Sequence, residues 1–210
     1  MNRLALLGAS GHGKVVADMA LMAGWDEVVF FDDAWPERLN NGPWSVQGTS
    51  ADLMSQLSSF NGVVVSIGHC KTRLDKQREL NKVGARLITI VHPAAVVSRH
   101  ATLGAGTVVM AGAVINIGAV IGVAGIVNTG SSIDHDCQLG DAVHVCPGAH
   151  LSGDVRVGAC SWIGVGAAVR QGLVIGQHVM VGAGGVVVSD VPDALTVAGN
   201  PARPLPARCD

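Results

Sequence analysis

Aromatic residues are scarce in this sequence. Its 210 residues include no tyrosine, three phenylalanines and four tryptophans, although 49% of the residues are hydrophobic. Aromatic rings normally supply much of the buried area of a globular core. Their scarcity favours a narrow core that is filled by repeated layers of valine, isoleucine and alanine.

Clustered positive charge is also missing. The chain carries 14 Lys and Arg against 16 Asp and Glu, for a formal net charge of −2, and it has no run of basic residues. Proteins that bind nucleic acid neutralise its phosphates with clustered Lys and Arg. We therefore expect no nucleic-acid partner.

Paired cysteines are absent as well. The five cysteines are odd in number and show no CxxC spacing (Cys70, Cys137, Cys146, Cys160 and Cys209). Such cysteine usage is typical of reduced thiols in the cytoplasm. The apolar run at residues 4–7 is too short for a signal peptide. We expect a cytoplasmic protein.

One long hydrophobic stretch does occur, at residues 107–127. It contains almost no polar side chain, and its length would suit a membrane-spanning helix. A six-residue repeat passes through it unchanged and continues for sixty residues beyond it. We therefore assign the stretch to the interior of a repeat structure and expect no membrane span.

The repeat extends from Val97 to Pro192. Stepping by six residues from Val97, all sixteen positions up to Val187 are aliphatic. The residue four places after each of them is small or β-branched, with Leu173 as the one large exception. Neither a helix nor an ordinary strand has a period of six, whereas each flat side of a parallel β-solenoid does.

Glycines spaced by eighteen residues indicate the number of sides. They form two series (Gly104, Gly122, Gly140, Gly158 and Gly176; Gly164 and Gly182). Glycine recurs where a backbone turns tightly or takes a positive φ, so each series marks one corner of successive coils. Eighteen residues are three hexapeptides, which predicts a triangular coil. At the strand spacing of a β-sheet, the sixteen hexapeptides make about five coils and a prism roughly 25 Å long.

Residues 1–92 predict a separate α/β domain. Strands are expected at residues 3–8, 28–31, 62–68 and 86–91, and helices at 15–23, 49–57 and 71–83. This alternation indicates a Rossmann-like domain with a parallel sheet. The solenoid domain then occupies residues 93–210.

Six residues of this domain follow its predicted strands (Ser10, Gly11, His12, Asp32, Asp33 and Gly68). Ligands of such sheets bind beyond the carboxyl ends of the strands. Glycines let a ligand approach the backbone, helix N-termini favour phosphate, and the two carboxylates can accept hydrogen bonds from a ribose or a base. The spacing is GxxGxG and not the dinucleotide pattern GxGxxG, so a strand–turn–helix corner without a ligand stays open.

His135 is the outstanding titratable residue of the repeat. Asp134 and Asp136 flank it. A carboxylate on one ring nitrogen fixes the tautomer and raises the basicity of the other nitrogen, which can then accept a proton. We predict a general base at His135 with Asp136 as its partner and Asp134 as the second choice. A solvated turn histidine is the alternative.

Metal chemistry is less well supported. His144 and His150 are six residues apart and therefore lie on neighbouring sides, and no two histidines show the His-x4-His spacing. Three histidines could still converge between subunits, as they do in gamma-class carbonic anhydrases. We expect no metal, and we expect Cys137, at a small inward position, to be buried and inert.

Five features of the chain together resemble one known family. They are Gly-Ala-Ser-Gly-His-Gly-Lys at 8–14, Phe-Asp-Asp at 31–33, the hexapeptide repeat, Asn-Thr-x-Ser-x-Ile-x-His-Asp at 128–136 and Gly-Asn-Pro-Ala-Arg-Pro at 199–204. The combination spans essentially the whole chain. It resembles the sialic-acid O-acetyltransferase-like sugar acetyltransferases, and within them most closely the bacterial N-acetyltransferases of bacillosamine biosynthesis, which acetylate a UDP-4-amino-4,6-dideoxy sugar.

The resemblance implies a left-handed β-helix, a homotrimer with acetyl-CoA between subunits, and no metal. It implies a general base at His135 and a residue that modulates the pKa of this base at Asp136. The other implied active-site positions are Asn128 and His144 lining the site, Gly153 near the thioester carbonyl, and Val165 and Ala183 along the pantetheine arm. The six residues after the strands of the first domain match contacts to the UDP-sugar.

Other functions stay open. The residues after the third predicted strand are Gly68-His69-Cys70, where the nearest relatives often carry Gly-Asn-Asn, so a GDP- or dTDP-linked amino sugar is an alternative substrate. An O-acetyltransferase acting on sialic acid or another sugar is a second alternative. A third, of a different class, is a non-catalytic NAD-binding protein in which the solenoid serves only to form a trimer.

Overall fold

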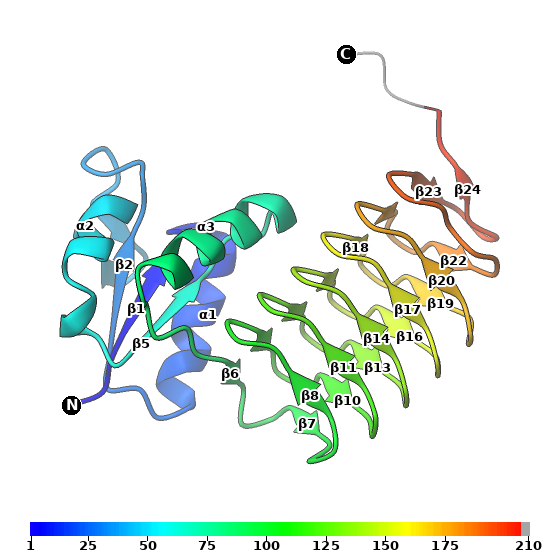
Figure 1. Cartoon of the computed structure of the whole chain (residues 1–210), viewed down its shortest axis with the longest axis horizontal. Helices are drawn as coiled ribbons and strands as arrows, with labels where there is room; N and C mark the ends of the chain where they lie inside the picture. Colours follow the sequence, from blue (N-terminus) through cyan, green and yellow to red (C-terminus); the bar gives the residue numbers. More distant parts are fainter. Residues whose placement is uncertain (207–210) are drawn as a thin grey trace. The chain divides into compact units, whose positions relative to one another are not determined.

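The computed structural model describes residues 1–206 and divides into two compact units, Met1–Pro93 and Ala94–Asp210 (Figure 1). The first unit is an α/β domain with a parallel sheet, and the second is a β-solenoid. The fold class predicted from the sequence is therefore confirmed.

The first unit is built on a three-stranded parallel sheet in the order β2-β1-β5. The interior positions of its strands are apolar and buried, as in sheets covered on both faces. The strands are β1 (Arg3–Leu7), β2 (Glu27–Phe31) and β5 (Gly62–Val65), with a hairpin of β3 (Asn40–Asn41) and β4 (Trp44–Ser45). The helices are α1 (Gly11–Met22), α2 (Ser50–Ser55) and α3 (Cys70–Lys82), with a 3-10 turn at Leu57–Ser59.

Two predictions for this unit need correction. Helix α1 begins at Gly11, four residues before the predicted start, because the glycine-rich turn continues directly into the helix. Gly13 sits in its first turn, where a Cβ would contact the Phe30 ring at 3.0 Å. The fourth strand, predicted at 86–91, is present only in part: Leu87 forms an isolated parallel bridge with Val63, and the short strand β6 (Ile90–Val91) lies outside the three-stranded sheet. The segment is apolar, but most of it stays partly exposed, and it adds no fourth strand to this sheet.

The capping box predicted at the start of the second helix is present. The Thr49 hydroxyl accepts a hydrogen bond from the Asp52 N–H at 3.3 Å, and the Asp52 carboxylate accepts one from the Thr49 N–H at 2.8 Å. These bonds satisfy donors that a helix leaves unpaired at its N-terminus.

The solenoid consists of sixteen two-residue strands that repeat every six residues. They are Val96–Val97, Thr102–Leu103, Val108–Val109, Val114–Ile115, Val120–Ile121, Ile126–Val127, Ser132–Ile133, Gln138–Leu139, His144–Val145, His150–Leu151, Arg156–Val157, Trp162–Ile163, Ala168–Val169, Val174–Ile175, Met180–Val181 and Val186–Val187, labelled β7 to β22 in this order. The second residue of each strand faces the interior and the first faces outward. The six-residue register therefore predicted every one of these strands.

Every third strand pairs in parallel, which gives three faces (Figure 1). We call them the first face (β7, β10, β13, β16, β19, β22), the second face (β8, β11, β14, β17, β20) and the third face (β9, β12, β15, β18, β21). Partner residues are eighteen apart, for example Ser132 and His150. The coil is triangular, as the glycine spacing indicated.

The glycines spaced by eighteen residues are not required by a positive φ. Gly104 lies in the turn between the second and third faces and does not have a positive φ. A Cβ on it would come within 2.5 Å of the carbonyl carbon of Gly122 in the next coil, so close approach of successive coils requires glycine there. Positive φ occurs at a different position of the hexapeptide. Every sixth residue from Gly106 to Gly184 has a positive φ, and six of these fourteen residues are not glycine.

The register slips by two residues at the end of the solenoid. Val191 bridges Ile175, and β23 (Thr196–Ala198) pairs with β21 through Val197 and Val181, so both partners are sixteen residues apart. The antiparallel strand β24 (Arg203–Pro204) then pairs with β23.

No helix within residues 1–206 is long and apolar enough to cross a membrane. The hydrophobic stretch 107–127 forms strands β9 to β12 of the solenoid. None of the four described cysteines forms a disulfide, and Cys209 lies outside the described residues.

Candidate active site

His135 lies in the turn between β13 and β14, at the corner where the first face meets the second. Its Nδ1 is 2.8 Å from Oδ2 of Asp136, so the predicted partner is in contact with the ring. Asp136 has a left-handed backbone with a φ of 62°, a conformation that Asp tolerates better than most residues. Asp134 instead accepts a hydrogen bond from Asn116 Nδ2 at 2.7 Å. The turn thus separates the two carboxylates, and only that of Asp136 contacts the imidazole ring.

Two glycines make room for this pair. Gly153 lies eighteen residues after His135, and a Cβ on it would come within 2.5 Å of ring atoms Cε1 and Nε2. Gly118 lies eighteen residues before Asp136, and a Cβ there would come within 2.5 Å of Oδ1. The imidazole therefore lies directly against the backbone of the following coil, with its Nε2 edge beside Gly153.

The electrostatic surroundings favour a basic imidazole. The hydrogen bond to Asp136 is the main cause that raises the pKa of His135, and the charges of Asp136, Asp134 and Asp154 add to it, while partial desolvation opposes the shift. The side chains of His135 and Asp136 are 62% and 68% exposed. A substrate can therefore reach the ring from solvent.

A second cluster lies at the corner where the third face meets the first. Asn128 follows β12 there, and its Nδ2 is 3.0 Å from Nε2 of His144. His144 is 4% exposed, and its ring centroid is 4.1 Å from that of Trp162 in the next coil, with the planes inclined at 56°. A neutral His144 that accepts at Nε2 carries its proton on Nδ1. The ring is held by an amide on one side and an indole on the other.

Val165 and Ala183 extend this Asn128 corner along the solenoid. They are eighteen residues apart, lie in successive turns and are both exposed. Their preceding residues Gly164 and Gly182 stack closely, because a Cβ on Gly164 would come within 2.7 Å of the Gly182 carbonyl carbon. The corner therefore presents a straight edge of exposed backbone.

The His135 corner and the Asn128 corner are the two edges of the first face. Strand β13 runs from one to the other, so the width of the face separates His135 from Asn128 and His144. The predicted solenoid residues thus form two half-sites within one chain.

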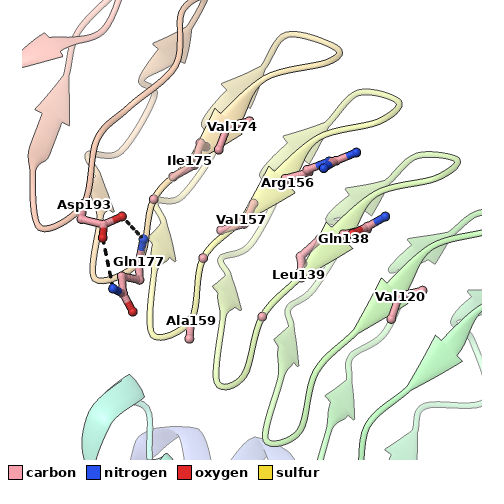
Figure 2. Close-up of a pocket in the computed structure, with 13 residues that line it drawn as sticks. Val120, Gln138, Leu139, Arg156, Val157, Ala159, Val174, Ile175, Gln177 and Asp193 are labelled. Atoms are coloured by element: carbon pink, nitrogen blue, oxygen red, sulfur yellow. Dashed lines mark hydrogen bonds between the residues drawn. The ribbon is translucent and has the colours of Figure 1, made fainter.

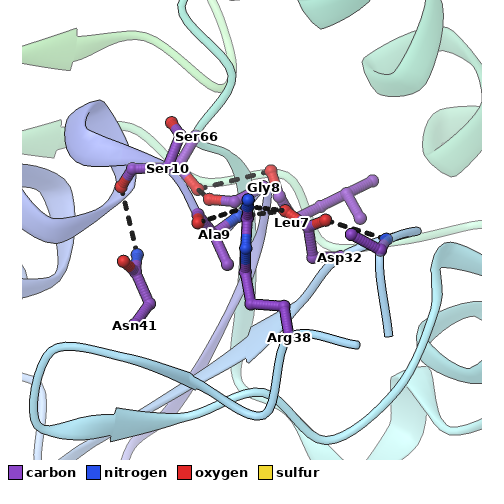
Figure 3. Close-up of polar contacts among 9 residues, drawn as sticks. Leu7, Gly8, Ala9, Ser10, Asp32, Arg38, Asn41 and Ser66 are labelled. Atoms are coloured by element: carbon purple, nitrogen blue, oxygen red, sulfur yellow. Dashed lines mark hydrogen bonds and ion pairs between the residues drawn. The ribbon is translucent and has the colours of Figure 1, made fainter. Parts of the chain in front are cut away.

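In the first unit, Asp32 closes the turn after β1 (Figure 3). Its carboxylate accepts hydrogen bonds from the backbone N–H of Ala9 at 2.6 Å and of Ala34 at 2.9 Å. Arg38 donates to the Ala9 carbonyl at 2.7 Å and lies 3.3 Å from the same carboxylate. Asn41 Nδ2 adds a bond to the Ser10 carbonyl at 3.1 Å. Asp32 therefore organises the turn that carries Ser10.

Asp33 points to different partners. Its carboxylate accepts a hydrogen bond from the Ser50 N–H at 2.8 Å and forms an ion pair with Lys76 at 3.0 Å. Burial opposes the shift, but the bonds from Ser50 and Lys76 lower the pKa of Asp33. It joins the end of β2 to α2 and α3.

The remaining predicted residues lie at the start of α1 and after β5. Ser10 is the N-cap of α1 and makes no capping bond with its side chain. Gly11 and Gly68 have open space where a Cβ would project. Burial, aided by the charge of Arg73, lowers the pKa of His12 to about 4, so this ring is neutral near pH 7. These residues line a turn region in which a ligand can approach the backbone.

A solved structure covers nearly the whole chain. The acetyltransferase domain of PglB from Neisseria gonorrhoeae FA1090, in complex with acetyl coenzyme A, is 44% identical, with a TM-score of 0.93 over 98% of this chain and 100% of that one. The chain belongs to the PglD family of hexapeptide-repeat sugar N-acetyltransferases. The family predicted from the sequence, and the acetyltransferase class of that family, are confirmed.

Other comparisons agree with this membership. The family model for the PglD N-terminal domain matches residues 3–80. A variant of perosamine N-acetyltransferase from Caulobacter crescentus, in complex with CoA and GDP-perosamine, is 38% identical, with a TM-score of 0.93 over 99% of this chain and 98% of that one. UDP-N-acetylbacillosamine N-acetyltransferase from Bacillus subtilis (strain 168) is 36% identical over 117 residues. That match spans about half of each protein, 52% of this chain and 52% of the relative.

Three residues of this PglD-family chain escaped the sequence reasoning. Trp162 packs against His144 with its ring tilted, Gly118 makes room for Asp136, and Arg38 donates a hydrogen bond to the turn after β1. The first two lie eighteen residues from a predicted site residue, so the coil period applied to each candidate would have found them. Arg38 has no such signal, because its contact depends on how two loops fold together.

Two other features carry no chemistry for this site. A concavity of about 540 Å³ lies on the second face, lined by residues such as Gln138 and Arg156, and contains none of the predicted residues (Figure 2). Asp193 at its rim is already bonded to Gln177. Cys137 is fully buried, as expected, and burial raises the pKa of its thiol, which disfavours the reactive thiolate.

Proposed function

We propose that this chain transfers an acetyl group from acetyl-CoA to the 4-amino group of a UDP-4-amino-4,6-dideoxy sugar, with His135 as the general base. This proposal rests on the contact between His135 and Asp136, and on Gly153, whose missing side chain leaves room for the His135 ring. The N. gonorrhoeae relative supports it, because its structure is a complex with acetyl coenzyme A.

The geometry suits direct transfer within a ternary complex. The sugar amine attacks the thioester carbonyl carbon, and Nε2 of His135 accepts the proton that the amine loses. Asp136 accepts the hydrogen bond from Nδ1 and stabilises the imidazolium. The backbone N–H of Gly153 donates to the oxyanion of the tetrahedral intermediate. The intermediate then expels the CoA sulfur, which takes the proton from His135, and the acetamide and free thiol result.

The separation of the two half-sites supports a homotrimer. Asn128 and His144 lie across the first face from His135, so one chain does not present all three to the same acetyl group. A second copy can place its Asn128 corner against the His135 corner of the first, and a ring of three closes these contacts. In this arrangement acetyl-CoA lies between subunits, with the pantetheine arm along Val165 and Ala183.

We assign the nucleotide to the first unit. Ser10, Gly11, His12, Asp32, Asp33 and Gly68 follow its strands, where parallel sheets bind ligands. Asp32 and Asp33 already hold backbone groups, so we expect their role to combine shaping the site with contacts to the base or ribose. The name of the B. subtilis relative supports a UDP-sugar. The C. crescentus complex supports a GDP-linked amino sugar as the second candidate. We expect the enzyme to act in the cytoplasm and the acetyl transfer itself to need no metal.

The test is release of free CoA from acetyl-CoA with a panel of acceptors. The panel contains UDP-, GDP- and dTDP-linked 4-amino-4,6-dideoxy sugars, the matching 4-hydroxy sugars and free sialic acid. We expect turnover with the UDP-amino sugar first, and none with the 4-hydroxy sugars. Acetylation of sialic acid alone would contradict N-acetylation. Thermal stabilisation by NAD and by none of the nucleotide sugars would contradict the assignment of the first unit.

A further inference from the structure

The outward side of the first face carries one imidazole. Its outward residues are otherwise aliphatic, apart from one serine (Val96, Val114, Ser132, His150, Ala168 and Val186). Ser132 and His150 are register partners in adjacent coils, and Ser132 Oγ lies 2.8 Å from Nδ1 of His150. His150 is exposed. One ring nitrogen is therefore held by the serine, and Nε2 is left for a group outside the chain.

The proposed trimer determines what this face meets, and the inference rests on it. The half-sites lie at the two edges of the first face. A closed ring of three that joins each His135 corner to the Asn128 corner of the next copy must turn the first faces inward. If the faces turned outward, the full width of a face would separate these corners.

The same geometry gives the distance to the threefold axis. A side of the coil contains six residues and is therefore at most about 20 Å long, so three inward sides that meet at their edges each lie within about 6 Å of the axis. A histidine side chain spans such a gap. Rotation by symmetry also places the three copies of His150 at one height along the axis.

We propose that the three His150 side chains of the trimer form a zinc site on its threefold axis. Each chain supplies Nε2 as one ligand, and water completes the tetrahedral arrangement that Zn²⁺ prefers with three protein ligands. Imidazole is a suitable ligand for zinc. With Nε2 bound to zinc, Nδ1 carries the proton and donates it to Ser132 Oγ, 2.8 Å away, which fixes the ring as partners of zinc-bound histidines usually do. Val114 and Val186 offer no competing ligand along the face.

Such a site is invisible within one chain. Residues 1–206 of a single chain contain no group of three His, Cys, Asp or Glu side chains that could hold a metal ion. Spacing rules for metal ligands also fail here, because each chain contributes a single ligand. The site is distinct from the proposed acetyl-transfer chemistry, which needs no metal and lies at the corners of the prism.

The test uses the full-length chain without an affinity tag. The protein is treated with chelator, loaded with zinc and passed through a desalting column, and zinc is measured by mass spectrometry. We expect one zinc ion per three chains in wild type and none in His150→Ala. His178→Ala, which removes an exposed turn histidine away from the first face, serves as the control and should bind as wild type does. Ser132→Ala should weaken zinc binding by about 10- to 100-fold.

Cobalt provides a second measurement. Cobalt-loaded wild type should show the visible absorption of a four-coordinate ion, and His150→Ala should lack it. Zinc retention by His150→Ala, or a wild-type trimer that binds no zinc, would overturn the site.

Molar mass and acetyl transfer are measured on the same samples, so that two failures remain distinguishable. An active trimer without zinc contradicts the metal site alone. A monomer, or a trimer inactive towards every acceptor, contradicts the proposed function. We expect His150→Ala to keep wild-type transfer at saturating substrates.

Discussion

The two histidine clusters of the solenoid use the same side chain in opposite environments. His135 stands in a turn, exposed, with the charges of Asp134, Asp136 and Asp154 around it. His144 stands on a strand, 4% exposed, between the Asn128 amide and the Trp162 ring. One solenoid thus produces an exposed, basic imidazole at one corner and a buried imidazole of fixed orientation at the next.

The difference follows from position within the hexapeptide. A turn residue projects from a corner, and only the coils directly before and after it can crowd it. An outward strand residue stands in a column of neighbours, as His144 does between Ile126 and Trp162. The exposed turn at His135 therefore suits a group that exchanges protons with a substrate, and the crowded column around His144 suits a group that must keep one orientation.

The strongest test of this contrast replaces the exposed histidine. His135→Gln should lower kcat/KM for the amino sugar by about 10²- to 10⁴-fold, because it removes the proton acceptor. His178→Gln changes another exposed turn histidine and should stay within twofold of wild type. Steady-state rates of CoA release measure both. Wild-type activity in His135→Gln would contradict the role of general base.

Mixed trimers test whether the two corners act together across subunits. His135→Gln and His144→Ala chains should each be nearly inactive. When equal amounts are denatured together and refolded, a site is intact where an unaltered His135 corner meets an unaltered Asn128 corner. This occurs at about a quarter of the interfaces of a random closed ring, so about a quarter of wild-type activity should return.

Refolding each variant separately is the control for the mixing experiment, and sedimentation confirms that trimers form. A mixture that stays as inactive as its parents would show that one chain supplies both half-sites.

The pH dependence sharpens the electrostatic side of the contrast. Asp136 raises the pKa of His135, and the base must be neutral to accept a proton. Wild type therefore loses activity as the pH falls through this raised pKa. Asp136→Asn should move the acidic limb of the kcat/KM profile to lower pH and reduce the plateau, because the imidazole becomes a weaker base. An unchanged limb would mean that another group controls it.

The solenoid was predictable in detail because each of its contacts repeats. An inward residue meets its equivalent in the next coil, so the aliphatic series from Val97 to Val187 is sufficient to place all sixteen strands. The partner of His135 was also predictable, since Asp136 is its neighbour in the same turn. The two-residue change of register after Val187 was not predictable, because it occurs once, at the end of the repeat.

Contacts between loops account for most of what the sequence did not reveal in the first unit. The Asp32 carboxylate accepts a hydrogen bond from the Ala9 N–H, and Arg38 donates to the Ala9 carbonyl and to the Asp32 carboxylate. These residues lie in loops that follow different strands. Nothing in their spacing indicates this clamp. The fourth strand was predicted too long for a related reason: apolar composition at 86–91 does not determine how many of these residues pair with β5, and only Leu87 forms a bridge there.

The finest test changes only the space beside the base. Gly118 and Gly172 both have positive φ, 75° and 69°, and both lie in turns at the His135 corner. A Cβ at Gly118 would come within 2.5 Å of Asp136 Oδ1, whereas a Cβ at Gly172 meets nothing within 4 Å. Alanine already occupies equivalent positions at Ala124 and Ala142, so the backbone accepts it at a cost of about 1 kcal/mol.

The two alanine variants should therefore lose similar stability but differ in activity. Gly118→Ala should displace the Asp136 carboxylate and lower kcat/KM by about tenfold, since small misplacements of catalytic groups are costly. Gly172→Ala should stay within twofold of wild type. Thermal melting checks that the two folds are equally perturbed. Equal activities in the two variants would mean that the position of Asp136 does not limit transfer, and the contrast between the two corners would then rest on His135 alone.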